Sequence, residues 1–246
     1  MNRHLLGQAV LQLFGLMYAT IKYRNMDYEK YLSGVKYSLP FHDEWYTANG
    51  GVTKNISHSW DILPQRFAYD FIILDEEGAS CQGDKKDLHS YYCYGKDILA
   101  PADGIVVSVK NSFPDCRIMD DGQTDLDTPD IGGNRIIIKH SKNEFSAICH
   151  LMPKSAIVQK GQTVKRGEVI AKCGNSGNTS EPHVHFQIQS TAGFYSCTGL
   201  PIFFSDILKR IYPKYSLVDT RPIPENEDIK EGYIHRGLLV KNLENK

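Results

Sequence analysis

Gln159-Lys160-Gly161-Gln162-Thr163-Val164-Lys165-Arg166-Gly167-Glu168 is a turn that leads into a strand, and it has an echo earlier in the chain. The earlier stretch, Ala100-Pro101-Ala102-Asp103-Gly104-Ile105-Val106, has the same plan. In both stretches glycine is expected to supply the positive φ that such a tight corner requires. The two corners favour a β architecture and carry no information about chemistry.

The chain around these corners has the pattern of antiparallel β structure. From about residue 51 to 200, short β-branched or aromatic runs alternate with Gly, Pro, Asn and Asp. The expected strands are Phe67–Leu74, Ile98–Ala100, Gly104–Lys110, Asn134–His140, Phe145–Leu151, Val169–Cys173 and His183–Ser190, with a hairpin connection at Ser141-Lys142-Asn143. Because the corners resemble those of barrel-sandwich folds, we predict a mostly β, antiparallel barrel-sandwich core.

The rest of the chain forms two extensions of this core. A chain of 246 residues is long enough for one domain with appendages and short for two full domains. We expect an N-terminal helical and irregular extension over 1–50, a domain over 51–200, and a C-terminal extension over 201–246 that packs on the core. Within these parts we expect a surface loop at the acidic stretch Pro114–Asp130 and a short helix at Phe203–Tyr212.

The N-terminal segment Leu5–Ile21 carries no charge and follows Arg3, as a signal peptide or membrane anchor would. However, Gln8, Gln12 and Thr20 interrupt it, and it barely reaches the roughly 17 residues that a spanning helix needs. No clear cleavage site follows it. Apolar residues share one helical face, and they are Leu5, Leu6, Ala9, Val10, Leu13, Leu16 and Met17. We therefore favour a docked amphipathic helix, with membrane association through residues 5–21 as the less favoured alternative.

Composition limits the partners of the chain. Lys and Arg number 28 and Asp and Glu number 29, which gives a formal net charge of −1. Since phosphate binding needs a basic excess, we expect no nucleic-acid partner. The cysteines are spread singly, without a C-x-x-C pair, and are expected to be buried or free thiols: Cys81, Cys93, Cys116, Cys149, Cys173 and Cys197.

The strongest chemical signal is His183-Val184-His185, which follows the glycine-rich loop Gly174–Asn178. Side chains two residues apart on a strand point to the same face, so both histidines can serve one site. Imidazole nitrogen is a ligand that zinc favours. The H-x-H pattern alone is weak evidence, because it also occurs by chance in surface strands.

Two further residues gain meaning beside this pair. Asp70 lies inside an apolar strand, where a carboxylate is costly to bury unless it is paired or bound to a cation. Arg66 or a backbone amide could also satisfy it. His150 ends the strand Phe145–Cys149, and alone it would be taken for a satisfied, partly buried histidine.

The order of these motifs resembles one known family. Along the chain come a strand with Asp70, Ala-Pro-Ala-Asp-Gly at 100–104, Gly-Asn-Arg-Ile-Ile-Ile-Lys-His at 133–140, His150-Leu151, Gly-Gln-Thr-Val-Lys-Arg-Gly at 161–167, and Gly-Asn-Ser-Gly-Asn at 174–178 before Pro182-His183-Val184-His185-Phe186. Over about residues 55–200 the chain resembles the lysostaphin-type (LytM-like) zinc metalloendopeptidases. The resemblance implies a duplicated hybrid motif fold, Zn²⁺ as cofactor, and peptidoglycan cross-bridge peptides as substrate. It also implies the cell envelope or the extracellular space as location.

The resemblance also implies roles for individual residues. Asp70 and the second histidine of H-x-H, His185, would bind zinc. His150 and the first histidine, His183, would act in catalysis. No other cofactor-binding residues are expected.

The chain departs from the family at one ligand. The usual motif is His-x-x-x-Asp, and the position four residues before Asp70 is Arg66, which cannot lose its proton and cannot ligate zinc. A subgroup with a Gln-Arg-aromatic-Ala-x-Asp pattern carries an upstream histidine, so we predict His58 as the third ligand. The remaining candidates are His42, His89 and His140.

We therefore predict a zinc metalloendopeptidase. Three protein ligands leave a zinc position open for water, and His150 and His183 would assist that water in attacking a peptide bond. Two alternatives stay open: a catalytically silent binding module of the same fold, and a phosphocarrier-like protein. The bond cleaved, the oligomeric state and the compartment are not determined by the sequence.

Overall fold

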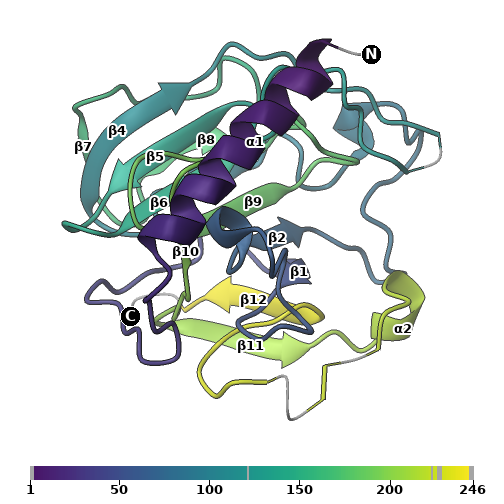
Figure 1. Cartoon of the computed structure of the whole chain (residues 1–246). Helices are drawn as coiled ribbons and strands as arrows, with labels where there is room; N and C mark the ends of the chain where they lie inside the picture. Colours follow the sequence, from purple (N-terminus) through teal and green to yellow (C-terminus); the bar gives the residue numbers. More distant parts are fainter. Residues whose placement is uncertain (1–2, 121, 223, 226–228, 244–246) are drawn as a thin grey trace.

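The computed structural model describes residues 3–120, 122–222, 224–225 and 229–243 (Figure 1). The strands are β1 (Trp45–Gly50), β2 (Tyr69–Ile72), β3 (Asp97–Leu99), β4 (Gly104–Lys110), β5 (Arg135–Lys139), β6 (Phe145–Cys149), β7 (Thr163–Val164), β8 (Val169–Lys172), β9 (Val184–Gln189), β10 (Gly199–Leu200), β11 (Ile207–Ile211) and β12 (Leu238–Asn242). The helices are α1 (Arg3–Lys22) and α2 (Tyr215–Val218), with 3-10 turns η1 (Leu63–Gln65) and η2 (Leu88–Ser90).

One large antiparallel sheet organises the molecule. Its strand order is β11-β12-β1-β2-β9-β6-β5-β4-β7, and β10 pairs with β9. The separate pair β3–β8 packs against this sheet, and one continuous apolar core contains Phe71 and Phe186 from the large sheet and Ile98 and Ile170 from the small one. The predicted mostly β, antiparallel class is confirmed.

The two corner stretches meet directly. Gly104 pairs with Val164, so the strand after the first corner lies beside the strand inside the second. Gly161 has the predicted positive φ of 93°. The prediction is wrong for Gly104, whose φ is not positive. Glycine is needed there because a Cβ would lie 2.6 Å from the backbone oxygen of Lys139 on the neighbouring strand β5.

The strand predictions over 51–200 are confirmed in outline, while both ends of the chain differ from expectation. The helix predicted at Phe203–Tyr212 is wrong, because β12 supplies hydrogen-bonding partners along Ile207–Ile211 and makes it a strand. The supposedly irregular stretch before residue 50 ends in strand β1, which pairs with β2 on one side and β12 on the other. Both extensions thus add strands to one sheet, and the division at residues 50 and 200 stays a prediction.

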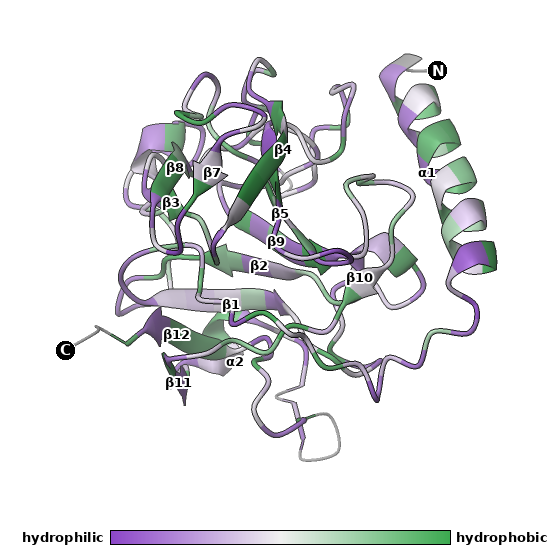
Figure 2. Ribbon diagram, turned by 90° about the vertical axis from the view of Figure 1, so that its left-hand side faces the viewer, coloured by the Kyte–Doolittle hydropathy of each residue, from purple (hydrophilic) through white to green (hydrophobic). Residues whose placement is uncertain are grey.

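The N-terminal helix forms as predicted, but it docks by a different face. Gln8, Gly15 and Ala19 are buried, whereas six of the seven residues of the predicted docking face are exposed and Leu16 is half-buried. The core presents hydrogen-bonding groups to α1 and comes close to the backbone of the helix. Amide and small side chains fit these contacts better than leucine does. Figure 2 shows α1 as a separate rod beside the stacked strands.

Candidate metal centre

Strand pairing brings Asp70 and His185 together. In the antiparallel register of β2 and β9, these two residues are direct partners. The distance between His185 Nδ1 and Asp70 Oδ1 is 3.0 Å. His183, two residues earlier on the same face, places its Nε2 at 3.7 Å from the same carboxylate oxygen.

His58 reaches the same carboxylate from the loop between β1 and η1. Its Nε2 lies 3.0 Å from Asp70 Oδ2, and its ring is perpendicular to that of His185 at a centroid distance of 4.9 Å. One ligand atom from each of His58, Asp70 and His185 lies within 4.8 Å of the other two. The structure therefore brings together the three residues predicted as metal ligands.

The two residues predicted to be catalytic stand beside this cluster. His150 follows β6, and its ring centroid lies 4.5 Å from that of His183. His150 Nδ1 is 2.7 Å from the backbone oxygen of Ser176, and His183 Nδ1 is 2.8 Å from that of Glu181. Because a carbonyl only accepts, each Nδ1 carries the hydrogen and each Nε2 keeps a free lone pair.

The electrostatics of the cluster keep charge on the carboxylate. Burial raises the pKa of Asp70, but the neighbouring histidines, His58 foremost, outweigh burial and hold that pKa well below its ordinary value. Burial, together with His183 and His185, lowers the pKa of His150 well below its ordinary value. A carboxylate anion thus faces a histidine that is neutral at neutral pH.

A chain of side-chain amides decides which nitrogen of His185 carries a hydrogen. The chain ends at the carbonyl of Thr191, which can only accept, so Gln189 Nε2 donates to it over 2.7 Å. Gln189 Oε1 then accepts from Gln187 Nε2 at 2.7 Å, and Gln187 Oε1 accepts from His185 Nε2 at 3.0 Å. The Nδ1 of His185 is left with its lone pair toward Asp70.

This arrangement fits a metal cation. Two lone pairs, on His185 Nδ1 and Asp70 Oδ1, face each other at 3.0 Å, and they repel unless a proton or a cation lies between them. His58 adds a third donor at the same place. A set of two imidazole nitrogens and one carboxylate is typical of catalytic zinc sites, so the residues present fit zinc.

Arg66, at the position of the usual ligand, has a structural role. Its Nε donates to the carbonyl of Trp60 over 2.7 Å, and its guanidinium lies 4.6 Å from the ring of Trp60 and 5.3 Å from that of Tyr28. Its own carbonyl accepts from Ser57 Oγ at 2.6 Å. Arg66 therefore holds the loop on both sides of His58, at Ser57 and at Trp60.

The other histidines considered as ligands lie elsewhere. His140 binds the carbonyl of Asp103 and the hydroxyl of Ser146 at the end of β5, and His89 bonds to Asp87 in η2. Neither these nor His42 is among the described residues that line the cavity at the metal centre.

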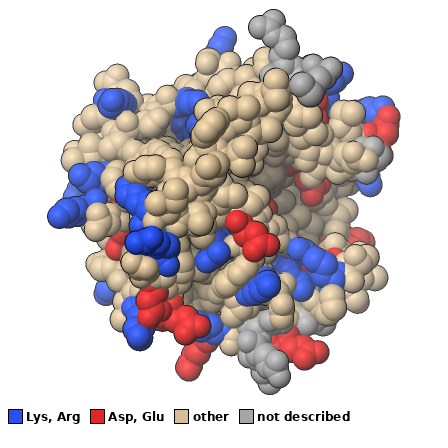
Figure 3. Space-filling model, in the orientation of Figure 1, with Lys and Arg blue, Asp and Glu red and all other residues tan. Residues whose placement is uncertain are grey.

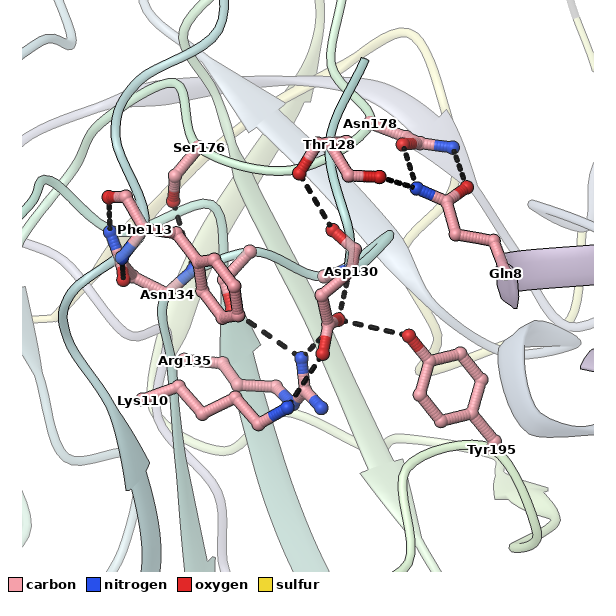
Figure 4. A network of polar contacts seen from close by, with 12 residues as sticks. Gln8, Lys110, Phe113, Thr128, Asp130, Asn134, Arg135, Ser176, Asn178 and Tyr195 are labelled. Atoms are coloured by element: carbon pink, nitrogen blue, oxygen red, sulfur yellow. Dashed lines mark hydrogen bonds and ion pairs between the residues drawn. The ribbon is translucent and has the colours of Figure 1, made fainter. Parts of the chain in front are cut away.

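Figure 4 shows a polar network around Asp130, and hydrogen bonds connect this network to the backbone of His150. Asp130 accepts from Arg135 at 2.5 Å and from Tyr195 at 2.9 Å, and it caps the amide of Gly132 at 3.1 Å. The carbonyl of Gly132 in turn accepts from the amide of His150, which adopts a positive φ of 59°. The strained backbone of His150 is thus held by a buried ion pair.

The cavity at the centre has a volume of about 310 Å³ and opens to the surface. Its walls include His58, Asp70, His150, His183 and His185, together with Gln12 of α1. Sequence reasoning missed Gln187 and Gln189, although both continue the period-two alternation that starts at His183 and His185.

Residues 88–195 match the model of Peptidase family M23. The chain contains a peptidase family M23 domain. The match includes His150, His183 and His185, while His58 and Asp70 precede it. This finding confirms the family resemblance of the motifs. M23 peptidases are metallopeptidases that act on peptidoglycan.

Curated relatives of the M23 domain are longer than this chain. The murein hydrolase activator NlpD of Salmonella dublin is 32% identical over 133 residues, which are 54% of this chain and 30% of that protein. The peptidoglycan DD-endopeptidase ShyA of Vibrio cholerae is 28% identical over 94 residues, 38% of this chain and 17% of that protein. The matched part thus spans less than a third of either relative.

Two solved structures are similar to this chain at low sequence identity. The catalytic domain of the M23 protein EnpA from Enterococcus faecalis is 15% identical, with a TM-score of 0.42 over 67% of this chain and 94% of that chain. A zinc-containing peptidase from Vibrio cholerae is 20% identical, with a TM-score of 0.40 over 68% of this chain and 41% of that chain.

Proposed function

We propose that the chain is a zinc metalloendopeptidase that hydrolyses peptide bonds in peptidoglycan. The observation that carries the proposal is the convergence of His58, Asp70 and His185 on one point, with the Nδ1 lone pair of His185 directed there by the amide chain of Gln187 and Gln189. These three residues would hold the metal. The M23 match supports the class of reaction.

The chemistry divides between the metal and two histidines. Zinc, when bound, lowers the pKa of a coordinated water to about 7 and polarises the peptide carbonyl. His150 and His183 keep their Nε2 lone pairs free, because each Nδ1 donates to a backbone carbonyl. Each Nε2 can therefore take a proton from the attacking water or, once protonated, donate a hydrogen bond to the developing oxyanion.

Peptidoglycan as substrate rests on the relatives and on the open cavity. ShyA and ShyB of Vibrio cholerae are both named peptidoglycan DD-endopeptidases. A cavity of about 310 Å³ that opens to the surface leaves room for a peptide to enter. This substrate would place the chain in the cell envelope or outside the cell.

A second candidate is a binding module of the same fold that activates another hydrolase. It is favoured by the NlpD proteins of Salmonella and Escherichia coli, which are named murein hydrolase activators. A phosphocarrier-like function is not supported, because Asp70 contacts the histidines that would have to carry the phosphoryl group.

The deciding experiment measures zinc and hydrolysis on the same preparation. Full-length protein purified without added metal is expected to contain one zinc per chain and to release peptides from cross-linked peptidoglycan, with the His183→Ala variant as inactive control. Zinc-loaded protein that releases nothing while stimulating a separate murein hydrolase would replace the peptidase proposal with the activator.

A further inference from the structure

The exposed surface of α1 is apolar to an unusual extent. Among the described residues of α1, the exposed large apolar side chains are Leu5, Leu6, Val10, Leu11, Leu13, Phe14, Met17, Tyr18 and Ile21. Figure 3 shows the corresponding ridge as an expanse without charged side chains, next to the hollow in the same face. Contiguous apolar surface of this size on a soluble protein marks an interaction site.

The distribution of these residues around the helix indicates what covers them. At about 100° per residue, the apolar positions from Leu5 round to Leu11 occupy an arc of about 240°. The docked stripe of Gly15, Gln8, Ala19 and Gln12 occupies only about 60°. A groove or a second helix covers one face of a helix, whereas lipid surrounds it on nearly all sides. The width of the arc therefore favours lipid.

Length and charge agree with a bilayer. At about 1.5 Å per residue, the twenty residues Arg3–Lys22 span about 30 Å, the thickness of the hydrocarbon layer. By length and composition α1 could cross a membrane, and only 17% of its most apolar window is buried. The helix contains no acidic residue, and Lys22 and Arg24 at its end complement anionic lipid head groups.

The contact between α1 and the core is slight enough to be exchanged. Gln8 and Asn178 pair through their amides at 3.0 and 3.1 Å, and Gln8 also donates to the carbonyl of Thr128. An apolar gap of about 130 Å³ lies between α1 and the core, lined by Leu13 and Leu16 on the helix side. Residues 23–27 form neither helix nor strand and connect α1 to Tyr28, whose hydroxyl lies 2.6 Å from Thr198 Oγ1 on the core, so the helix can move about this short connection.

We propose that α1 leaves its position against the core, inserts into a lipid bilayer and anchors the chain by spanning that bilayer. In the bilayer, the polar and small stripe that now faces the core would be the side available to other helices. Because Gln12 lines the cavity at the metal centre, the exchange also removes one wall of that cavity. The anchor itself does not depend on the proposed hydrolysis.

The experiment is flotation of the full chain with vesicles of phosphatidylethanolamine and phosphatidylglycerol, followed by an alkaline carbonate wash. Wild-type protein is expected to float and to remain on the vesicles after the wash. The double variant Leu13→Glu/Met17→Glu places two charges in the middle of the span, and its floated fraction is expected to fall at least tenfold.

A matched control separates insertion from general surface effects. Leu32 and Ile157 are apolar residues outside α1 that are 84% and 70% exposed. The double variant Leu32→Glu/Ile157→Glu adds the same charge and is expected to float like the wild type. Asn178→Ala removes one of the two partners that the core offers Gln8 without changing α1. At a lipid concentration so low that only a minor part of the wild type floats, this variant is expected to raise the floated fraction several-fold.

Several results would overturn the proposal. Wild-type protein that stays in the aqueous phase, or that the carbonate wash removes, does not span the bilayer. A lipid-free dimer that Leu13→Glu/Met17→Glu dissociates would show that a second copy covers the face. Floated chains that start after residue 22 would show that another segment holds the membrane, and an unchanged floated fraction in Asn178→Ala would contradict the exchange.

Discussion

The strand pair β2–β9 and the loop 51–62 both carry candidate zinc ligands, but different forces hold them. Asp70 and His185 are placed by backbone register, which every hydrogen bond of the two strands supports. His58 is placed by side chains, chiefly the guanidinium of Arg66 against Trp60 and Tyr28. A ladder positions its residues cooperatively, whereas a loop depends on a few contacts that single substitutions can remove.

The largest expected effect is on the strand side. The His185→Ala variant should lose its zinc and its hydrolytic activity, because it removes a ligand whose lone pair is directed by Gln187. The β2–β9 ladder should survive, since its hydrogen bonds are made by the backbone. Metal analysis and far-UV circular dichroism test both expectations, and full zinc occupancy in the variant would refute the ligand assignment.

A second test distinguishes the residues proposed to bind the metal from those proposed to act in catalysis. His150→Ala and His183→Ala should retain zinc and lose on the order of 10²–10⁴ in rate, the usual loss for a removed proton-transfer or oxyanion group. Turnover of cross-linked peptidoglycan at constant zinc content gives the answer. Near-wild-type turnover in either variant would remove that histidine from the catalytic pair.

The loop ligand gives the next effect in size. His58→Ala should retain the fold and lower zinc affinity by more than the roughly 10–100-fold that follows loss of a supporting group. Competition with a chromogenic chelator measures the affinity. His89→Ala is the matched control, because His89 lies outside the cavity and should bind zinc as the wild type does.

The smallest effects are expected from the residues that position two of the ligands, Gln187 for His185 and Arg66 for His58. Gln187→Met and Arg66→Met each remove one supporting group, and each should weaken zinc binding by about tenfold or more. Only Arg66→Met should also loosen the loop, so trypsin should cleave it faster after the exposed Lys54. Equal protease resistance in the two variants would show that Arg66 does not hold the loop.

This contrast also explains what could be predicted from the sequence. Asp70 and His185 lie on strands, and His183 directly precedes β9. Period two determines the face there, so alternation alone places the two histidines together. The same alternation continues through Gln187 and Gln189, and those residues could have been identified. His58 lies in a loop without periodicity, and its assignment as a ligand came from the resemblance to a subgroup of the family instead of from the pattern.

Predictions for the fold divide in a similar way. Strands with β-branched, apolar or alternating runs, such as β5, β6 and β9, were predicted within one or two residues. The two-residue strands β7 and β10 leave no pattern to detect. β11 was taken for a helix because its partner β12 is separated from it by a long connection. α1 was predicted to dock by its apolar face, because helical periodicity does not reveal that the core presents polar groups to the helix.

The position of β12 has a consequence for synthesis of the protein. β2, which carries Asp70, pairs with β1, and β1 pairs with β12 at Trp45 and Val240. The ribosome therefore releases β1 almost two hundred residues before its neighbour β12 is synthesised. Until the last strand emerges, β1 is an open edge that can pair with other chains. A premature stop before Leu238 should therefore yield aggregating chains instead of a shortened, folded protein.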